Sequence, residues 1–535
     1  MSRTRFVKGK YVKITQGDHN MSAEGHIRSN AKDEVREKGN KKGVSHNTFE
    51  RQGSTVNEDF EITFSLKKDE GYSTVVPFGI LDFEGHYENA QFAFHYTLML
   101  SNIDSLDFKI LNEDGSTLYA ITNLPTVTIV AKRQLPSLLD AIYKNKPEHN
   151  PFDPIRIWDW KSILGPYKVS SDDYTKVGSY VIFWDGFDNN DVYDSNNFNN
   201  KKLKAQIIAR KNGKEKRKEV EFSTERKEVD WVDVKIDRKN KKIDTTLRVN
   251  LQDGGSKGFE KERYKDPLDD PRLPPYKERY VWEKIPASVI AKWGKQPIKV
   301  RTKTFEDLKQ LAINGINYHW GRNQNHAQAK DVKIVDDSYE VYIDTINSNN
   351  SAMDDIDLLY NTNYFMGRSN NPGCVSGFKS FLANLSQYIP YIPLSETIYY
   401  NVGYVNNVYK AESHFLFKES WIYIDETSLY KNGKSKVDME YGYTCAHEIG
   451  HSILRAYSEG GGGSADYSYK HKGSSGYSET KPVSEGGVSY PISGEIDVMK
   501  YFNNAPYFLN YDFERIIAED KDILGLIWLV KIEIK

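Results

Sequence analysis

The sequence of 535 residues contains only two cysteines, Cys374 and Cys445, so no network of disulfides holds its fold together. Long apolar runs are also absent. The longest, Ile523 to Val530, is far shorter than the roughly 20 residues of a membrane-spanning helix, and we expect a buried segment there. Residues Met1 to Ile14 lack the apolar core of a signal peptide. These absences predict a protein that is made in the cytoplasm without a conventional export signal.

The sequence also lacks a strong excess of either charge. The net charge is −2 although 28% of the residues are charged, so no strong field draws the whole chain toward nucleic acid or anionic lipid. Hydrophobic residues make up 38% and aromatic residues 13%, which is enough to build packed cores. A chain of this length predicts about two to four domains.

Residues 1 to 55 are polar, yet glycines recur in them at a spacing of eight, at Gly9, Gly17 and Gly25. A short fixed period of this kind is typical of a β-helical coil, in which every rung repeats the same turn. We therefore predict a needle-like segment, and a disordered tail stays open as the alternative.

Residues 56–150 and 151–255 alternate between apolar and polar side chains, as strands do. Asp114-Gly115 and Asn212-Gly213 stand between such strands, where they predict hairpin turns. We expect a β-rich domain followed by a β-sandwich domain, both antiparallel. In residues 256–300 several prolines stand among charges, which predicts an extended linker or a surface crossing.

From residue 301 to 535 the pattern mixes helices and strands, which predicts an α+β domain. Thr304 is a candidate N-cap, Val332 to Val335 and Trp421 to Ile424 are typical of strands, and Glu440 to Tyr457 has the periodicity of a helix. The predicted fold is thus multidomain: an N-terminal β part and a C-terminal α+β domain.

The predicted helix contains the run His447-Glu448-Ile449-Gly450-His451. Residues four apart share one face of a helix, so the two imidazoles can bind one zinc ion, and Glu448 can act as general base on a zinc-bound water. The opposite face is apolar, with Ala446, Ile449, Ile453, Leu454 and Tyr457. The alternative is a pair of surface histidines on a solvated helix.

A catalytic zinc site needs a third protein ligand. Tyr457 occupies the position where the long metzincin pattern would have its third histidine, which excludes that pattern. The candidates that remain open carry carboxylate or imidazole side chains: Glu459, Asp466, His471, Glu485, Glu495 and Asp497. His471 follows His451 by twenty residues, and Glu495 is expected in the first turn of a second helix after Pro491.

The runs His447 to His451, Tyr469 to Ser474 and Gly494 to Tyr501, in this order, resemble the zincin module at the C-terminus of certain VgrG spike proteins, which are effectors of type VI secretion systems. The resemblance covers roughly residues 300 to 535. It implies His447, His451 and Glu495 as zinc ligands and Glu448 as general base. His471 is the alternative ligand or stabilises the oxyanion, a role for which Tyr469 and Tyr490 are weaker candidates.

The front of the chain departs from this family, because the much larger phage-tail-like regions of a spike protein are missing. The resemblance therefore implies a separate cargo effector that docks on a VgrG-like spike trimer through its N-terminal segment. It would be a secreted zinc endopeptidase toxin of interbacterial competition, which cleaves a protein in the target-cell periplasm and is neutralised in the producer by a cognate immunity protein. The alternative is a non-enzymatic spike or adaptor β-protein with a structural zinc site, closed by a fourth protein ligand.

Overall fold

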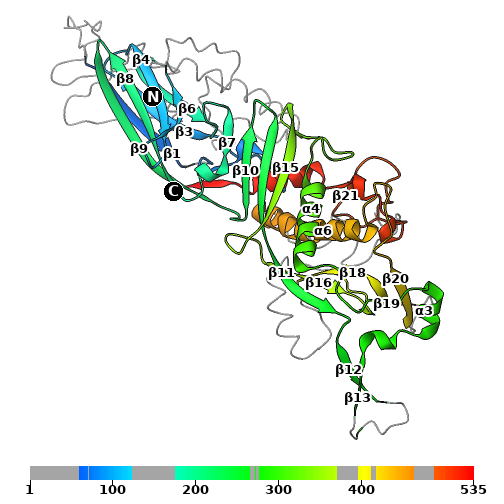
Figure 1. The fold of residues 1–535 in the computed structure, drawn as a ribbon. Coiled ribbons are helices and arrows are strands. Elements are labelled where there is room, and N and C mark those ends of the chain that lie inside the picture. Colours follow the sequence, from blue (N-terminus) through cyan, green and yellow to red (C-terminus); the bar gives the residue numbers. More distant parts are fainter. Residues whose placement is uncertain are drawn as a thin grey trace, which may run out of the picture. The chain divides into compact units, whose positions relative to one another are not determined.

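A computed structural model describes residues 59–69, 71–122, 175–265, 272, 276–369, 396–410, 417–462 and 487–535 of the chain. In this part strands predominate over helices and form several sheets, so the chain is β-rich, as the sequence predicts (Figure 1). The predicted needle-like segment, residues 1 to 55, lies outside the described residues. None of the helices in the described part has the length and hydropathy that crossing a membrane requires.

Two antiparallel sheets pack on each other near the N-terminus. The first contains β1 (Glu61–Lys67), β3 (Phe92–Met99) and β6 (Gly178–Trp184). The second contains, in order, β2 (Thr74–Val75), β23 (Ile532–Ile534), β9 (Lys214–Arg226), β8 (Lys201–Lys211), β4 (Ser105–Leu111) and β5 (Thr117–Ile121). Aromatic rings join the sheets: the ring centroids of Phe94 and Phe108 lie 5.1 Å apart. In the first sheet β3, which precedes residue 150, pairs with β6, which follows it. Residue 150 therefore does not separate one sheet from another.

Both predicted hairpin turns are confirmed. The turn at Asp114-Gly115 joins β4 to β5, and the turn at Asn212-Gly213 joins β8 to β9. Gly115 and Gly213 have φ angles of 83° and 73°, which a glycine adopts without steric cost.

A third sheet combines antiparallel and parallel strands. Its order is β14 (Val332–Ile334), β15 (Asp337–Asn347), β11 (Lys242–Lys257), β10 (Val232–Asp237) and β7 (Val192–Asp194). The first half of β11 pairs in parallel with β15, and its second half pairs in parallel with β16 (Asp355–Asn361). Next to β16 lies β18 (Thr397–Asn401). The half of β11 that pairs with β15, residues 242–249, lies before residue 256, and β15 follows residue 300, so this sheet joins the predicted β-sandwich region directly to the predicted α+β region.

The expected extended linker, residues 256–300, contains regular structure in its described part. Strands β12 (Lys261–Tyr264) and β13 (Lys277–Tyr280) form a hairpin, and α3 (Ala287–Trp293) follows. Cross-strand contacts hold the hairpin: Lys261 Nζ lies 5.1 Å from the ring centroid of Tyr280, and Arg279 Nε donates to Glu262 Oε1 over 2.9 Å. Charged residues of the predicted linker therefore pair across two strands.

A small sheet contains β17 (Tyr364–Phe365), β19 (Gly403–Lys410) and β20 (Phe417–Ile424). Strand β20 includes the predicted strand Trp421 to Ile424, and it pairs antiparallel with β19.

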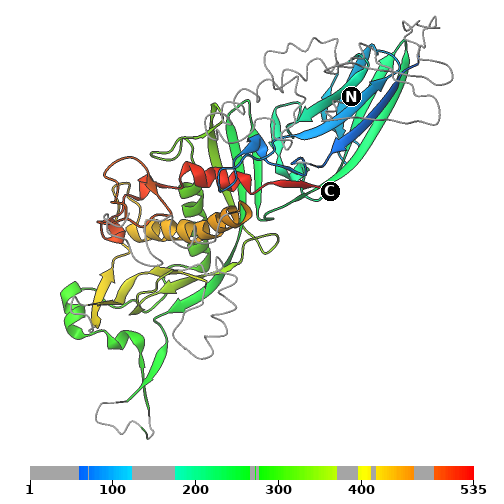
Figure 2. The same cartoon turned by 180° about the vertical axis from the view of Figure 1, so that it is seen from behind.

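Two helices pack against each other beside the third sheet. They are α4 (Phe305–Trp320) and α6 (Lys436–Gly460), drawn close together in Figures 1 and 2. Thr304 caps α4 as predicted, because its hydroxyl accepts from Asp307 N and the Asp307 carboxylate accepts from Thr304 N. The two backbones meet at Gly315 and Gly442, where a Cβ built on Gly315 would lie 2.2 Å from the Gly442 carbonyl oxygen.

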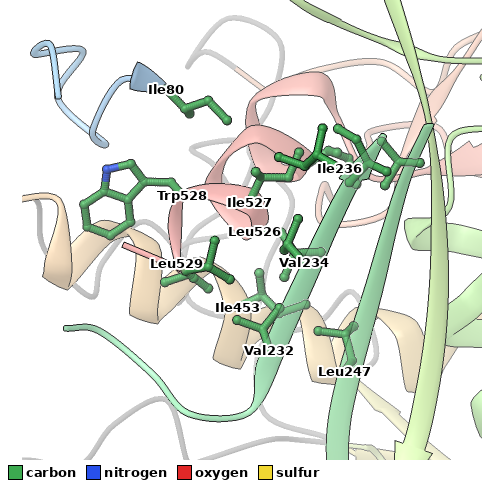
Figure 3. Packing of buried hydrophobic residues seen from close by; sticks show 14 of the residues in the cluster. Ile80, Val232, Val234, Ile236, Leu247, Ile453, Leu526, Ile527, Trp528 and Leu529 are labelled. Atoms are coloured by element: carbon green, nitrogen blue, oxygen red, sulfur yellow. The ribbon is translucent and has the colours of Figure 1, made fainter. Parts of the chain in front are cut away.

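The C-terminal apolar run is buried, as predicted, in α8 (Asp520–Trp528), which packs on α6. Figure 3 shows part of the core that results, in which Trp528 and Leu529 belong to one cluster with Ile453 of α6 and with Val232 and Val234 of β10. The helices are therefore anchored to the third sheet by apolar burial.

We predict that Gly315→Ala destabilises the protein. The added methyl group meets the backbone of α6, which cannot move aside as a flexible side chain would, so the loss is at least the roughly 1–3 kcal/mol that overpacking costs. The free energy of unfolding measures it. Asn314→Ala, at the exposed neighbouring position of α4, is the matched control and should change stability little. Equal stability of both variants would contradict this close contact.

Candidate active site on helix α6

Helix α6 presents His447 and His451 on the same face, one turn apart. Their ring centroids lie 4.9 Å apart, and both side chains are buried together with Glu448. All five residues of the predicted apolar face are buried as well. Gly450 allows a close approach, because a Cβ there would lie 2.3 Å from Met499 Sδ. The predicted helix, its core face and the pairing of the two histidines are thus confirmed.

The tautomer of His447 follows from its hydrogen bond. Its Nδ1 lies 2.7 Å from the Val498 carbonyl oxygen, which can only accept, so Nδ1 carries the proton and Nε2 carries the lone pair. Burial lowers the pKa of His447 to about 4, which keeps the imidazole neutral at physiological pH. A neutral imidazole whose other nitrogen donates to a carbonyl is the usual form of a histidine that binds a metal.

The Val498 carbonyl is held by a short parallel pair of strands, β21 (Ile496–Asp497) and β22 (Ile516–Ile517). Val498 N donates to the Ile517 carbonyl over 3.0 Å. The Ile516 carbonyl lies 2.8 Å from His319 Nδ1 of α4 and 3.1 Å from His326 Nε2. Two buried histidines thus hold β22, and β22 in turn holds Val498, whose carbonyl orients His447.

Glu495 differs from its prediction. Gly494 to Tyr501 do not start a helix, because Gly494 has a φ of 77° and the following residues pair with β22. The Glu495 carboxylate accepts from Nη1 and Nη2 of the buried Arg322 over 2.9 and 2.8 Å. Within the described ranges, no three His, Cys, Asp or Glu side chains form a group that could hold a metal ion. The structure therefore does not bring Glu495 to the two histidines, and its role as a ligand stays a prediction.

The other predicted candidates divide into two sets. Asp466, Tyr469, His471 and Glu485 lie outside the described residues. Glu459 accepts from Arg455 Nε over 3.0 Å in the last part of α6, and Asp497 accepts from Met499 N over 2.9 Å. The hydroxyl of Tyr490 accepts from Asp512 N over 3.0 Å. These three described side chains hold local structure.

The structure adds two groups from other segments of the chain to the site. Tyr501 stacks on His447 with ring centroids 5.5 Å apart and an interplanar angle of 10°. Burial and the nearby Glu448 carboxylate raise the pKa of Tyr501 to about 12, whereas Arg368 lowers it. Arg368 also lowers the pKa of His447. Tyr501 ends the run Gly494 to Tyr501 that carries part of the resemblance, but no spacing in the sequence places either residue beside His447, so their position in the site comes from the fold.

Two further residues belong to α6 itself. Tyr443 precedes His447 by one turn, with ring centroids 6.1 Å apart, and Glu440 precedes it by two turns. Burial raises the pKa of Glu440 to about 7, although the Thr444 hydroxyl donates to its carboxylate over 3.1 Å and opposes the shift. Helical periodicity places both on the face of His447, and this signal could have identified them from the sequence.

Comparisons with protein-family models, with curated proteins and with solved structures find no match for this chain. Its function is therefore inferred from the residues of the site.

We predict that Glu440→Gln stabilises the protein at alkaline pH. The folded-state pKa of Glu440, about 7, lies above its ordinary value of 4.5, so wild-type stability is lost as the pH rises between these values. The Glu440→Gln variant has no carboxyl group at this position, so its stability does not fall over this pH range. Its advantage above pH 7 has an upper limit of about 3 kcal/mol, because one pKa unit corresponds to about 1.4 kcal/mol and the group is partly exposed.

Chemical denaturation between pH 4.5 and 8 measures this difference. Glu306→Gln, at an exposed position of α4, is the matched control and should follow the wild type at every pH. If the free energy of unfolding depends on pH equally in Glu440→Gln and in the wild type, the folded state does not disfavour the charged form of Glu440.

Proposed function

We propose that this chain is a zinc-dependent endopeptidase in which His447 and His451 bind the metal and Glu448 is the general base. The observation that carries the proposal is the buried pair of imidazoles 4.9 Å apart, one of them held in a metal-binding tautomer by Val498. A solvated helix would leave both histidines exposed and protonated near pH 6. The donors therefore fit a zinc ion.

The chemistry of peptide hydrolysis suits the residues around this pair. A zinc ion held by His447 and His451 would lower the pKa of a bound water and polarise the peptide carbonyl. Glu448 accepts the proton of the attacking water and passes it to the leaving amine as the amide bond breaks. Tyr501 keeps its proton at neutral pH, so its hydroxyl is a donor for the carbonyl oxygen as that oxygen gains charge.

The third ligand is the open part of this proposal. Ligation by Glu495 requires that two charge-assisted hydrogen bonds from Arg322 break, and such bonds are stronger than neutral ones. Ligation by His471 leaves the pair of Glu495 and Arg322 intact. We therefore keep both residues as candidates and distinguish them by experiment.

We expect the purified protein to bind about one zinc ion per chain and to cleave peptides. Glu448→Gln should keep the zinc and lose activity by roughly 10²- to 10⁴-fold, because it removes only the general base. Elemental analysis and a fluorogenic peptide assay measure the two quantities. Joint replacement of His447 and His451 by alanine should abolish both. Full activity in Glu448→Gln would sink the catalytic assignment.

The third ligand is identified by zinc affinity. Replacing the true ligand should weaken zinc binding strongly, whereas replacing the other candidate should leave it near the wild-type value. If Glu495 only pairs with Arg322, Glu495→Gln lowers thermal stability and keeps the zinc, and His471→Ala loses the zinc. Retention of the zinc in both variants would exclude both residues. A zinc closed by four protein ligands would instead support the structural site of a non-enzymatic adaptor.

We further propose, from the resemblance to VgrG zincin modules, that a type VI secretion system delivers the chain as a toxin. Residues 1 to 55 would dock on a VgrG-like spike trimer, the substrate would be a periplasmic protein of the target cell, and an immunity protein would protect the producer. Contact-dependent killing that requires both the spike and Glu448 tests this proposal. Killing that persists without the spike would contradict it.

A further inference from the structure

The polar face of α6 continues beyond the histidines toward the start of the helix. Glu440, Thr444, His447 and His451 follow at spacings of four, three and four, so they lie in one row. With a rise of 1.5 Å per residue, Glu440 lies about 10 Å along the helix from His447. A peptide bound along this face would therefore pass Glu440 within about three residues of the bond to be cleaved, because an extended chain advances about 3.3 Å per residue.

Three tyrosines lie on or near the part of α6 that carries Glu440. Tyr443 is the next residue on the same face of α6, and its ring centroid lies 5.9 Å from that of Tyr511. Tyr507 stands just before the 3-10 turn η10 (Phe508–Asn510), which contacts α6 and whose Asn510 accepts from Lys436 Nζ over 3.1 Å. Burial raises the pKa of Tyr443, Tyr507 and Tyr511, and the charge of Glu440 adds to the rise in each of them.

The charge of this carboxylate is not balanced by a cation of the described part of the chain. The Glu440 carboxylate accepts a hydrogen bond from the Thr444 hydroxyl, and among the described residues it forms no ion pair. The nearest lysine on its own helix, Lys436, is held by Asn510. Placing a carboxylate in partly buried surroundings without a cation costs stability, so a cation that arrives with a ligand would recover that cost.

Aromatic rings and one carboxylate together suit an organic cation. A lysine or arginine side chain gains from the faces of the rings and from the negative charge, whereas a divalent metal ion needs several oxygen or nitrogen ligands in close array. The described residues contain no such array. The side chain of Tyr507 is 50% exposed, so solvent reaches this ring of the group.

We propose that Glu440, Tyr443, Tyr507 and Tyr511 form a subsite that binds the side chain of a lysine or arginine in the peptide substrate, about three residues from the cleaved bond. This inference rests on the proposed peptidase function, since it assigns the substrate class of the same site. It makes the enzyme selective for basic peptide segments.

The test measures binding with the full-length, zinc-loaded Glu448→Gln protein, which holds peptides without cleaving them. The probes are fluorescent decapeptides of alanine and glycine with one lysine moved along the chain, each compared with its norleucine counterpart of the same shape. At the best position we expect lysine to bind roughly ten-fold more tightly than norleucine. Adding Glu440→Gln should reduce this ratio to about one, and adding Glu306→Gln should leave it unchanged.

A second variant separates the charge from the fold. Tyr507→Leu removes one exposed ring and keeps Glu440, so the lysine preference should fall several-fold without disappearing. A ten-fold preference that survives Glu440→Gln, or the absence of any preference at every position, would overturn the subsite.

The subsite and the peptidase function can fail independently. If the wild-type protein cleaves none of these peptides and the lysine preference in binding depends on Glu440, the subsite stands and the peptidase proposal fails. If the wild-type protein cleaves lysine and norleucine peptides with equal kcat/KM and binding shows no preference either, the peptidase stands and the subsite fails.

Discussion

The position of the candidate site depends on the contact between the backbones of α4 and α6. Gly315 and Gly442 let the two helices meet without side chains between them. One turn further along α6, the Trp320 indole donates to the Ala446 carbonyl over 3.0 Å, and after a second turn Gly450 faces Trp320 and Met499. One side of α6 is thus fixed along more than two turns. Among the described residues, the side with the histidines meets Val498, Tyr501 and Tyr511.

Hydrogen bonds then set the chemistry of that side. Helix α4 contributes His319, which with His326 binds the Ile516 carbonyl, and the strand pair that begins there places the Val498 carbonyl on His447. His319, His326 and His447 each meet a carbonyl oxygen, and burial lowers the pKa of His319 and His447 to about 4. Neutral, oriented imidazoles are therefore built into the fold before any ligand binds, which is how metal sites are commonly preorganised.

The sequence predicts those features that depend on short-range periodicity. The apolar and polar alternation of β8 and β9, the turn at Asn212-Gly213 and the two faces of α6 are all local patterns, and the structure agrees with them. The parallel pairing of β11 with β15 joins residues about a hundred positions apart, and no local pattern encodes it. Glu495 was expected in a helix because Gly494 was not recognised as a turn residue, and its pairing with Arg322 depends on the same long-range contacts.

Strand β23 has a consequence for the order in which the chain can fold. It fills the place between β2 and β9, so the second sheet of the N-terminal sandwich waits for a strand that is synthesised after α6 and α8. Until residues 532–534 emerge from the ribosome, the edge of β9 has no neighbour on that side, and an open edge invites pairing with other chains. The second sheet of the sandwich is therefore complete only after the helices that bear the candidate site have been synthesised, and until then the open edge of β9 can pair with other chains.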